Sequence, residues 1–142
     1  MIDFRSLNKG VKIEGFPLPR IDDILTSLGG SKVFSSLDLR SAFHQVKLDA
    51  ESKELTAFTV NDKKFQFQRL PFGYVNSSKV FQAVMSKALS SSLGKCAFVF
   101  LDDILVYSSN YDWHIRDIER LLSNLREAGL KLKLEKCVFF QE

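Results

Sequence analysis

The chain has 142 residues, of which 45% are hydrophobic, 12% aromatic and 26% charged. This length fits one domain or part of one with a real hydrophobic core, and no run of about 18 apolar residues predicts a membrane span. The net charge of +3 does not by itself indicate a nucleic-acid-binding protein, and the N-terminus has no signal-peptide pattern. Cys96 and Cys137 lie far apart without metal-type spacing, which favours reduced core thiols in an intracellular protein.

The N-terminal segment predicts little regular structure before one short helix. Residues 1–15 show weak periodicity, so we expect them to be extended or loop. Pro17 and Pro19 predict an extended segment, because proline fixes φ and keeps the preceding residue out of the helical region. A helix fits Arg20–Leu28, whose apolar residues share one face, and the two glycines that follow should end it.

The next segment predicts strands. Val33–Leu39 is expected to be a strand, and Val46–Leu48 a second short extended piece. Thr56–Val60 and Lys64–Gln68 flank the turn-forming residues 61–63, which is a hairpin signal.

The middle of the chain combines a helix with the most apolar run of the sequence. Apolar residues from position 76 to about position 89 have helical spacing. Two apolar runs follow, Ala97–Leu101 and Ile104–Ser108. We expect them to form a tight hairpin with Asp102 and Asp103 at its tip.

The C-terminal segment predicts one amphipathic helix and two strands. The helix runs from about Asp112 to Ala128 and is capped by Gly129. Leu130–Leu134 alternates leucine and lysine like a strand with one wet face, and Cys137–Phe140 is a last apolar strand. Helices alternating with a mainly antiparallel sheet predict an α+β fold with the helices on one side.

The paired aspartates are the most informative chemical feature. Burying two adjacent carboxylates is costly because they repel, and a divalent cation would neutralise them. If Asp38, at the end of the first predicted strand, lies beside Asp102 and Asp103, the cluster could hold two Mg²⁺ ions about 4 Å apart. The alternatives are a solvated turn for the pair, and a strand-end or helix-cap role for Asp38.

Several motifs occur in a characteristic order. They are Asp3-Phe4-Arg5-Ser6-Leu7-Asn8, the run from Phe16 to Asp23, Phe34-Ser35-Ser36-Leu37-Asp38-Leu39-Arg40-Ser41-Ala42-Phe43-His44-Gln45, Leu70-Pro71-Phe72-Gly73, Phe100-Leu101-Asp102-Asp103 and Ala128-Gly129-Leu130-Lys131-Leu132. In these motifs the chain resembles the fingers–palm region of reverse transcriptases, especially those of gypsy-type LTR retrotransposons and, more distantly, retroviruses. The resemblance implies the palm of a right-hand polymerase plus part of its fingers.

The resemblance assigns roles residue by residue. It implies that Asp38, Asp102 and Asp103 are the catalytic, metal-binding carboxylates. Phe43 matches an aromatic steric gate against a ribose 2′-OH, although an ordinary core phenylalanine is the alternative. The remaining nucleotide-binding positions are Leu39, Arg40, Ser41, Ala42, Phe72 and Gly73, and the nucleic-acid-binding positions are Phe100, Leu101, Pro71 and Gln82. Lys133 or Lys136 matches a lysine proposed to protonate pyrophosphate, or is an ordinary strand charge, and His114 is expected to be helix-surface or structural.

The resemblance also implies cofactors and partners. It implies two Mg²⁺ ions, with Mn²⁺ as a substitute, deoxynucleoside triphosphates, and an RNA or DNA template with its primer. Residues 1–32 and about 49–75 would be fingers-like, and residues 33–48 and 76–142 palm-like. A preceding fingers strand, a thumb and a ribonuclease H domain are expected in the parent polyprotein and absent from this chain, and the protein would be cytoplasmic, in a virus-like particle, or nuclear. The alternative is a non-catalytic, retrotransposon-derived remnant that binds nucleic acid or protein.

Overall fold

The structure, a computed structural model, describes residues 2–13, 15 and 20–142. The chain divides into two compact units. The first unit comprises Met1–Gly15 and Ser41–Phe81, and the second comprises Phe16–Arg40 and Gln82–Glu142. These boundaries differ from those expected for fingers-like and palm-like segments, and that division stays a prediction. The expected extension at Pro17 and Pro19 lies outside the described residues.

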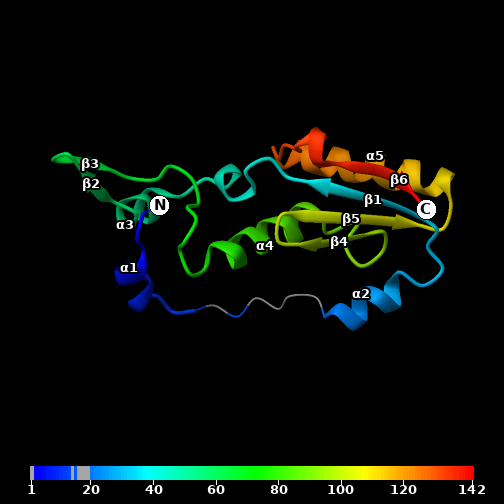
Figure 1. Cartoon of the computed structure of the whole chain (residues 1–142), viewed down its shortest axis with the longest axis horizontal. Helices are drawn as coiled ribbons and strands as arrows, with labels where there is room; N and C mark the ends of the chain where they lie inside the picture. Colours follow the sequence, from blue (N-terminus) through cyan, green and yellow to red (C-terminus); the bar gives the residue numbers. More distant parts are fainter. Residues whose placement is uncertain (1, 14, 16–19) are drawn as a thin grey trace. The chain divides into compact units, whose positions relative to one another are not determined.

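A four-stranded antiparallel sheet forms the second unit. Its strands are β1 (Val33–Asp38), β4 (Ala97–Phe100), β5 (Asp103–Ser108) and β6 (Val138–Gln141), in the spatial order β4-β5-β1-β6. Figure 1 shows β1 running beside β5 and β6, with α5 along the sheet. The expected α+β fold with a mainly antiparallel sheet is therefore confirmed.

The helix α5 (Tyr111–Glu127) packs on β1 and β5 because one of its faces is apolar. Ile118, Leu121 and Leu125 are buried along that face at helical spacing. The Asn110 side chain caps the helix by accepting a hydrogen bond from the Trp113 N–H at 3.0 Å. Gly129 follows the helix with φ +71°, a left-handed conformation that glycine adopts without strain. Both helix ends lie within a residue of the predicted ones.

Two other predicted helices are confirmed. They are α2 (Ile21–Ser27) and α4 (Ser77–Ala88). The predicted strand at Leu130–Leu134 is wrong. Only Leu132 forms a bridge, with Leu39, and the chain then turns into the short 3₁₀ helix η2 (Leu134–Lys136). Alternation of leucine and lysine could not show that pairing stops after one residue.

The first unit contains short elements and several aromatic rings that contact one another. The short elements are α1 (Arg5–Lys9), the 3₁₀ helix η1 (Ala42–Gln45), α3 (Ala50–Leu55), and the hairpin of β2 (Phe58–Val60) and β3 (Lys63–Phe65). The hairpin confirms the sequence prediction, but its strands are shorter than the predicted Thr56–Val60 and Lys64–Gln68, and Lys63 belongs to β3 and not to the turn. Its turn residues Asn61 and Asp62 both have positive φ, 48° and 58°, as in a type I′ turn.

Three of these short elements were not predicted, namely α1, η1 and α3. Each spans at most six residues, too few to show a helical period. The start of α3 nevertheless has a local cause, because Asp49 accepts a hydrogen bond from the Ser52 N–H at 2.7 Å. Residues 1–15, expected to be extended or loop, therefore contain one helical segment.

The cysteines and the helices show two further features. Cys96 and Cys137 are both free, Cys96 being buried and Cys137 half-buried. No helix within the described part of the chain is long and apolar enough to cross a membrane.

Candidate functional site

The three predicted carboxylates come together at one end of the sheet in the second unit. β1 ends at Asp38, and β5 begins at Asp103, directly opposite Asp38 in the antiparallel register. Asp102 precedes Asp103, and its carbonyl accepts a hydrogen bond from the Leu39 N–H at 3.3 Å. Side chains directly opposite each other in an antiparallel pair are neighbours, and two like charges there destabilise the sheet. The register therefore brings like charges together, and a bound cation would offset their repulsion.

The electrostatics of Asp103 reflect this arrangement. Partial burial raises the pKa of the Asp103 carboxyl, and the negative charges of Asp102 and Asp38 raise this pKa further. Lys136 acts in the opposite direction. Its Nζ lies 3.5 Å from Oδ2 of Asp38, which is the more enclosed of the two side chains in this ion pair. One cation thus balances part of a cluster of three carboxylates.

The hairpin corrects two details of the sequence interpretation. The turn between β4 and β5 consists of Leu101 and Asp102, so Asp103 belongs to the ladder and not to the tip. Asp102 and Asp103 are also exposed. The flanking Val99 and Ile104 point inward and are buried. The apolar run therefore supplies side chains to the core, and the charged pair lies at the surface. The pair therefore does not carry the cost of full burial that the surrounding apolar run suggested.

Leu101 has φ +55° at this turn, an uncommon conformation for a branched side chain. Among the described residues, no group of three or more histidine, cysteine, aspartate or glutamate side chains is arranged so that it could hold a metal ion, and this includes the three carboxylates. An ion there would need further oxygen ligands, such as water or substrate phosphate.

The predicted nucleotide-binding residues around residue 40 belong to both units. Leu39 is buried, and the Arg40 N–H donates to the Lys131 carbonyl at 3.0 Å, both in the second unit. Ser41 has φ +49° and precedes η1, where Ala42 is buried and Phe43 half-buried. The chain thus turns sharply directly after the β1 carboxylate.

Phe43 belongs to an aromatic cluster inside the first unit. Its ring centroid lies 4.9 Å from that of Phe72 and 5.4 Å from that of Phe81. Phe81 is fully buried and Phe72 is 48% exposed. His44 contacts the Phe72 ring edge-on at 5.1 Å. Phe43 is therefore packed on one side and half-buried, as a rigid, partly accessible ring should be.

Asn8 holds the loop that carries Gly73, a role that sequence reasoning missed. Its amide Nδ2 donates to the Gly73 carbonyl at 2.9 Å, and its Oδ1 accepts from the Val75 N–H at 2.9 Å. Gly73 has φ +87°, which explains glycine at this position. The only sequence signal for Asn8 was its place in the first of the quoted motifs.

The predicted nucleic-acid-binding residues differ in accessibility. Pro71 and Gln82 are buried, and the Gln82 Nε2 donates to the Val99 carbonyl at 3.3 Å. Phe100 is 52% exposed and Leu101 half-buried. Of the four predicted residues, Phe100 and Leu101 are therefore accessible to a nucleic acid. Pro71 and Gln82 pack in the interior.

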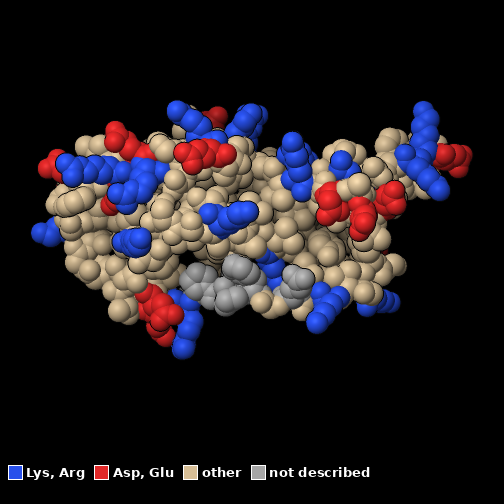
Figure 2. Space-filling view, turned by 180° about the vertical axis from the view of Figure 1, so that it is seen from behind, with Lys and Arg blue, Asp and Glu red and all other residues tan. Residues whose placement is uncertain are grey.

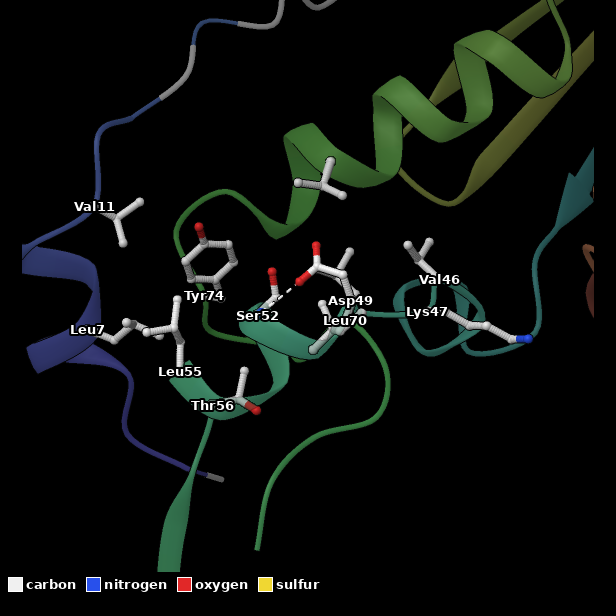
Figure 3. Close-up of a pocket in the computed structure, with 12 residues that line it drawn as sticks. Leu7, Val11, Val46, Lys47, Asp49, Ser52, Leu55, Thr56, Leu70 and Tyr74 are labelled. Carbon is white, nitrogen blue, oxygen red and sulfur yellow. Dashed lines mark hydrogen bonds between the residues drawn. The ribbon is translucent and has the colours of Figure 1, made fainter.

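The first unit also contains an apolar cavity of about 260 Å³ (Figure 3). Leu7 of α1 and Leu55 of α3 line it together with Tyr74 and Val11, and the Asp49–Ser52 hydrogen bond lies at its wall. The predicted site residues are not among the described residues that line it.

Comparison with known proteins places this geometry in a family. The family model described as "Reverse transcriptase (RNA-dependent DNA polymerase)" matches residues 1–142. The chain belongs to the reverse transcriptase family.

Similar proteins support this assignment. This reverse transcriptase chain is 40% identical over its full length to the retrovirus-related Pol polyprotein from transposon gypsy of Drosophila melanogaster. It is 34% identical over its full length to the enzymatic polyprotein of Cauliflower mosaic virus (strain Strasbourg). The chain spans only 14% and 21% of those two proteins. The matched regions therefore lie within larger polyproteins.

Solved structures agree in fold. The foamy viral protease-reverse transcriptase in complex with RNA/DNA hybrid superposes with a TM-score of 0.86 and 31% identity. The match covers 98% of this chain and 19% of the viral chain. A structure of the foamy viral protein in complex with dsDNA gives a TM-score of 0.85 and 30% identity.

The charge distribution of this reverse transcriptase chain is mixed. On the face shown in Figure 2, basic side chains are interspersed with acidic ones and form no single broad patch. This agrees with the net charge of +3. Reverse transcriptases generally use divalent metal ions, and the cross-strand carboxylates described above are a donor set of the kind that hard cations prefer.

Proposed function

We propose that this chain forms the catalytic core of an RNA-directed DNA polymerase, which adds deoxynucleotides to a primer 3′-OH. One observation carries the proposal, namely that the β1–β5 register places Asp38 opposite Asp103 and beside Asp102. A fold has no need to align like charges in this way unless they bind a cation. The family of the chain supports the same reaction.

Asp38, Asp102 and Asp103 would hold two Mg²⁺ ions, or Mn²⁺ in their place. Bound ions would supply positive charge for the attacking and leaving oxygens of phosphoryl transfer. The contribution of the chain is to fix the carboxylates on paired strands, which are more rigid than loops. Phosphate oxygens of the incoming nucleotide and water would supply the remaining ligands.

Nucleotide selection would depend on Phe43. A ring held by Phe72 and Phe81 cannot move aside easily, so it would clash with a ribose 2′-OH and favour deoxynucleotides. Of the turn Arg40–Ala42, the Ser41 and Ala42 N–H groups would face the triphosphate, because the Arg40 N–H already donates to the Lys131 carbonyl. Phe72 and Gly73 would pack on the nucleotide. Phe100 and Leu101 would contact the primer or template.

The proposal includes the wider assembly. An RNA or DNA template with its primer is the expected partner, and the thumb and ribonuclease H would come from the rest of the polyprotein. Residues 1–32 and about 49–75 would serve as fingers, and residues 33–48 and 76–142 as palm.

Primer extension tests the proposal. In a reverse transcriptase that contains this chain, Asp102→Asn should reduce Mg²⁺-dependent extension on an RNA template by at least about a hundredfold, because it removes charge aimed at the reacting phosphate. Asp112→Asn, an exposed aspartate in the first turn of α5, is the matched control. Unchanged extension by Asp102→Asn would refute the metal role.

The same assay addresses the alternative of a non-catalytic remnant. If the unaltered protein binds an RNA/DNA hybrid but extends no primer at any Mg²⁺ or Mn²⁺ concentration, the binding module is the better description. The three aspartates favour the enzyme, because aligned like charges destabilise the metal-free sheet and the Lys136–Asp38 ion pair offsets only part of that repulsion.

A further inference from the structure

A buried polar network crosses the second unit, and none of the roles assigned above uses it. His114 on α5 is fully buried, and its Nε2 lies 2.7 Å from the Ser35 Oγ on β1. Its Nδ1 lies 2.9 Å from the Ser108 Oγ on β5. The Ser108 hydroxyl donates to Oδ2 of Asp117 at 2.8 Å, and the Phe140 N–H on β6 donates to the Ser35 Oγ at 3.1 Å.

The chemistry of these groups determines every proton in the network. A carboxylate only accepts, so the single Ser108 proton points to Asp117. The Ser108 oxygen must then accept from His114, which places the imidazole proton on Nδ1. The Nε2 of the neutral ring is left as an acceptor and receives the Ser35 proton. The Ser35 oxygen keeps a lone pair for the Phe140 N–H.

The last of these bonds lies at an irregularity of the sheet. Phe34 pairs with Gln141 and Ser36 with Val138, so β6 carries an extra residue between the two pairs. Phe140 lies in this bulge with φ +55°. Its N–H bonds to the Ser35 side chain, which replaces the ladder partner that the bulge removes.

The bulge lies four residues after a segment that contacts Asp38. The Lys133 N–H donates to the Asp38 carbonyl at 2.8 Å, and the Lys136 Nζ lies 3.5 Å from Oδ2 of Asp38. Only Cys137 and the start of β6 separate Lys136 from the bulge. A shift of the bulge along β1 would therefore be passed on to the segment that contains these lysines.

We propose that His114 is a positioning residue, which as the neutral Nδ1–H tautomer orients Ser35, fixes the β6 bulge at Phe140 and so sets the segment that flanks Asp38. The inference rests on the proposed function only in that Asp38 is taken as a catalytic carboxylate. The network and the bulge stand on geometry alone.

Protonation of His114 should disturb this arrangement. Both ring nitrogens would then donate, so the Ser35 oxygen would face two N–H donors and its own proton would lose its acceptor. The charged groups nearby are Asp117 and Arg120, whose Nη1 lies 3.8 Å from Oδ1 of Asp117. The Cys96 thiol and the Tyr107 hydroxyl interact electrostatically with Asp117. From β6 the uncharged Phe140 ring faces His114 edge-on at 5.2 Å, and β1 contributes the Ser35 hydroxyl.

Nuclear magnetic resonance on the 142-residue chain tests the proposal with Ser35→Ala and a matched control, Ser36→Ala, at the exposed neighbouring position of β1. The ¹⁵N spectrum should show His114 with its proton on Nδ1. In Ser35→Ala the Phe140 amide should exchange with solvent at least about tenfold faster relative to the β1–β5 ladder, because its part-buried hydrogen bond to the Ser35 hydroxyl is lost. The Asp38 ¹³Cγ resonance should shift more in Ser35→Ala than in Ser36→Ala, although Ser36 lies nearer to Asp38 and on the same face of β1.

Acidification gives a second readout. In the unaltered chain, exchange of the Phe140 amide relative to the same ladder should rise as His114 titrates, and in Ser35→Ala it should not follow that titration. An Nε2–H tautomer, or a Phe140 amide equally protected in Ser35→Ala, would overturn the network. An Asp38 resonance unchanged in Ser35→Ala would overturn the positioning role. None of these results depends on polymerase activity, so failure here is separable from failure of the proposed function.

Discussion

Replacing Asp103 with asparagine should make the metal-free chain more stable while removing polymerase activity. Asp103 and Asp38 are directly opposite on paired strands, and Asp102 adds a third negative charge. Asn has nearly the same shape as Asp but carries no charge. The substitution therefore removes repulsion without creating a cavity.

The size of the effect follows from the register. Opposite side chains lie about 5 Å apart at Cβ, where two unit charges repel by about 0.8 kcal/mol in bulk water and about 3 kcal/mol at an effective dielectric constant of about 20. Asp103 is exposed, so the lower part of this range applies, and Lys136 offsets some of the repulsion. We expect Asp103→Asn to raise the free energy of unfolding by about 1 kcal/mol, or Tm by about 3–5 °C.

Thermal and urea unfolding in EDTA measure this gain in stability. Glu119→Gln is the control, since it removes one exposed negative charge on the helix α5 and not from the three carboxylates. Addition of about 10 mM Mg²⁺ should stabilise the unaltered chain more than Asp103→Asn, because a ligand that binds only the folded state shifts unfolding by mass action. If Asp103→Asn is less stable than the unaltered chain in EDTA, or only as stable as Glu119→Gln, the strand register does not place the carboxylates in a repulsive arrangement that a cation relieves.

Four other changes have defined outcomes. Phe43→Val should raise incorporation of ribonucleotides relative to deoxynucleotides by at least about tenfold in single-nucleotide extension, and unchanged discrimination would contradict the gate. Phe81→Ala should cost about 3–5 kcal/mol in urea unfolding, because it empties a fully buried site. Asn110→Ala should cost about 1 kcal/mol through loss of the α5 cap, measured in the same way. Burial lowers the pKa of His114 from its ordinary 6.5, so the unfolded chain takes up this proton first, and stability should fall as pH drops below about 6.5, but not in His114→Gln.

Local sequence signals were sufficient for the longer elements. The helices α4 and α5 show their apolar faces in the spacing of residues, and α5 also carries its own cap and terminal glycine. The β2–β3 hairpin is marked by a turn whose two residues tolerate positive φ. These features depend on residues a few positions apart, which is why they can be read without a tertiary structure.

The sequence by itself determined that Asp38 ends one apolar strand and that Asp102 and Asp103 lie between two others. Its motifs determined the family. Only the tertiary structure decided that Asp38 faces Asp103, that the pair is exposed, and that Gln82 is buried. It also decided that the bulge in β6 is held by a serine more than a hundred residues earlier in the chain. Strand register and long-range hydrogen bonds depend on how distant segments pack, and a periodic pattern in one segment contains no information about its partner.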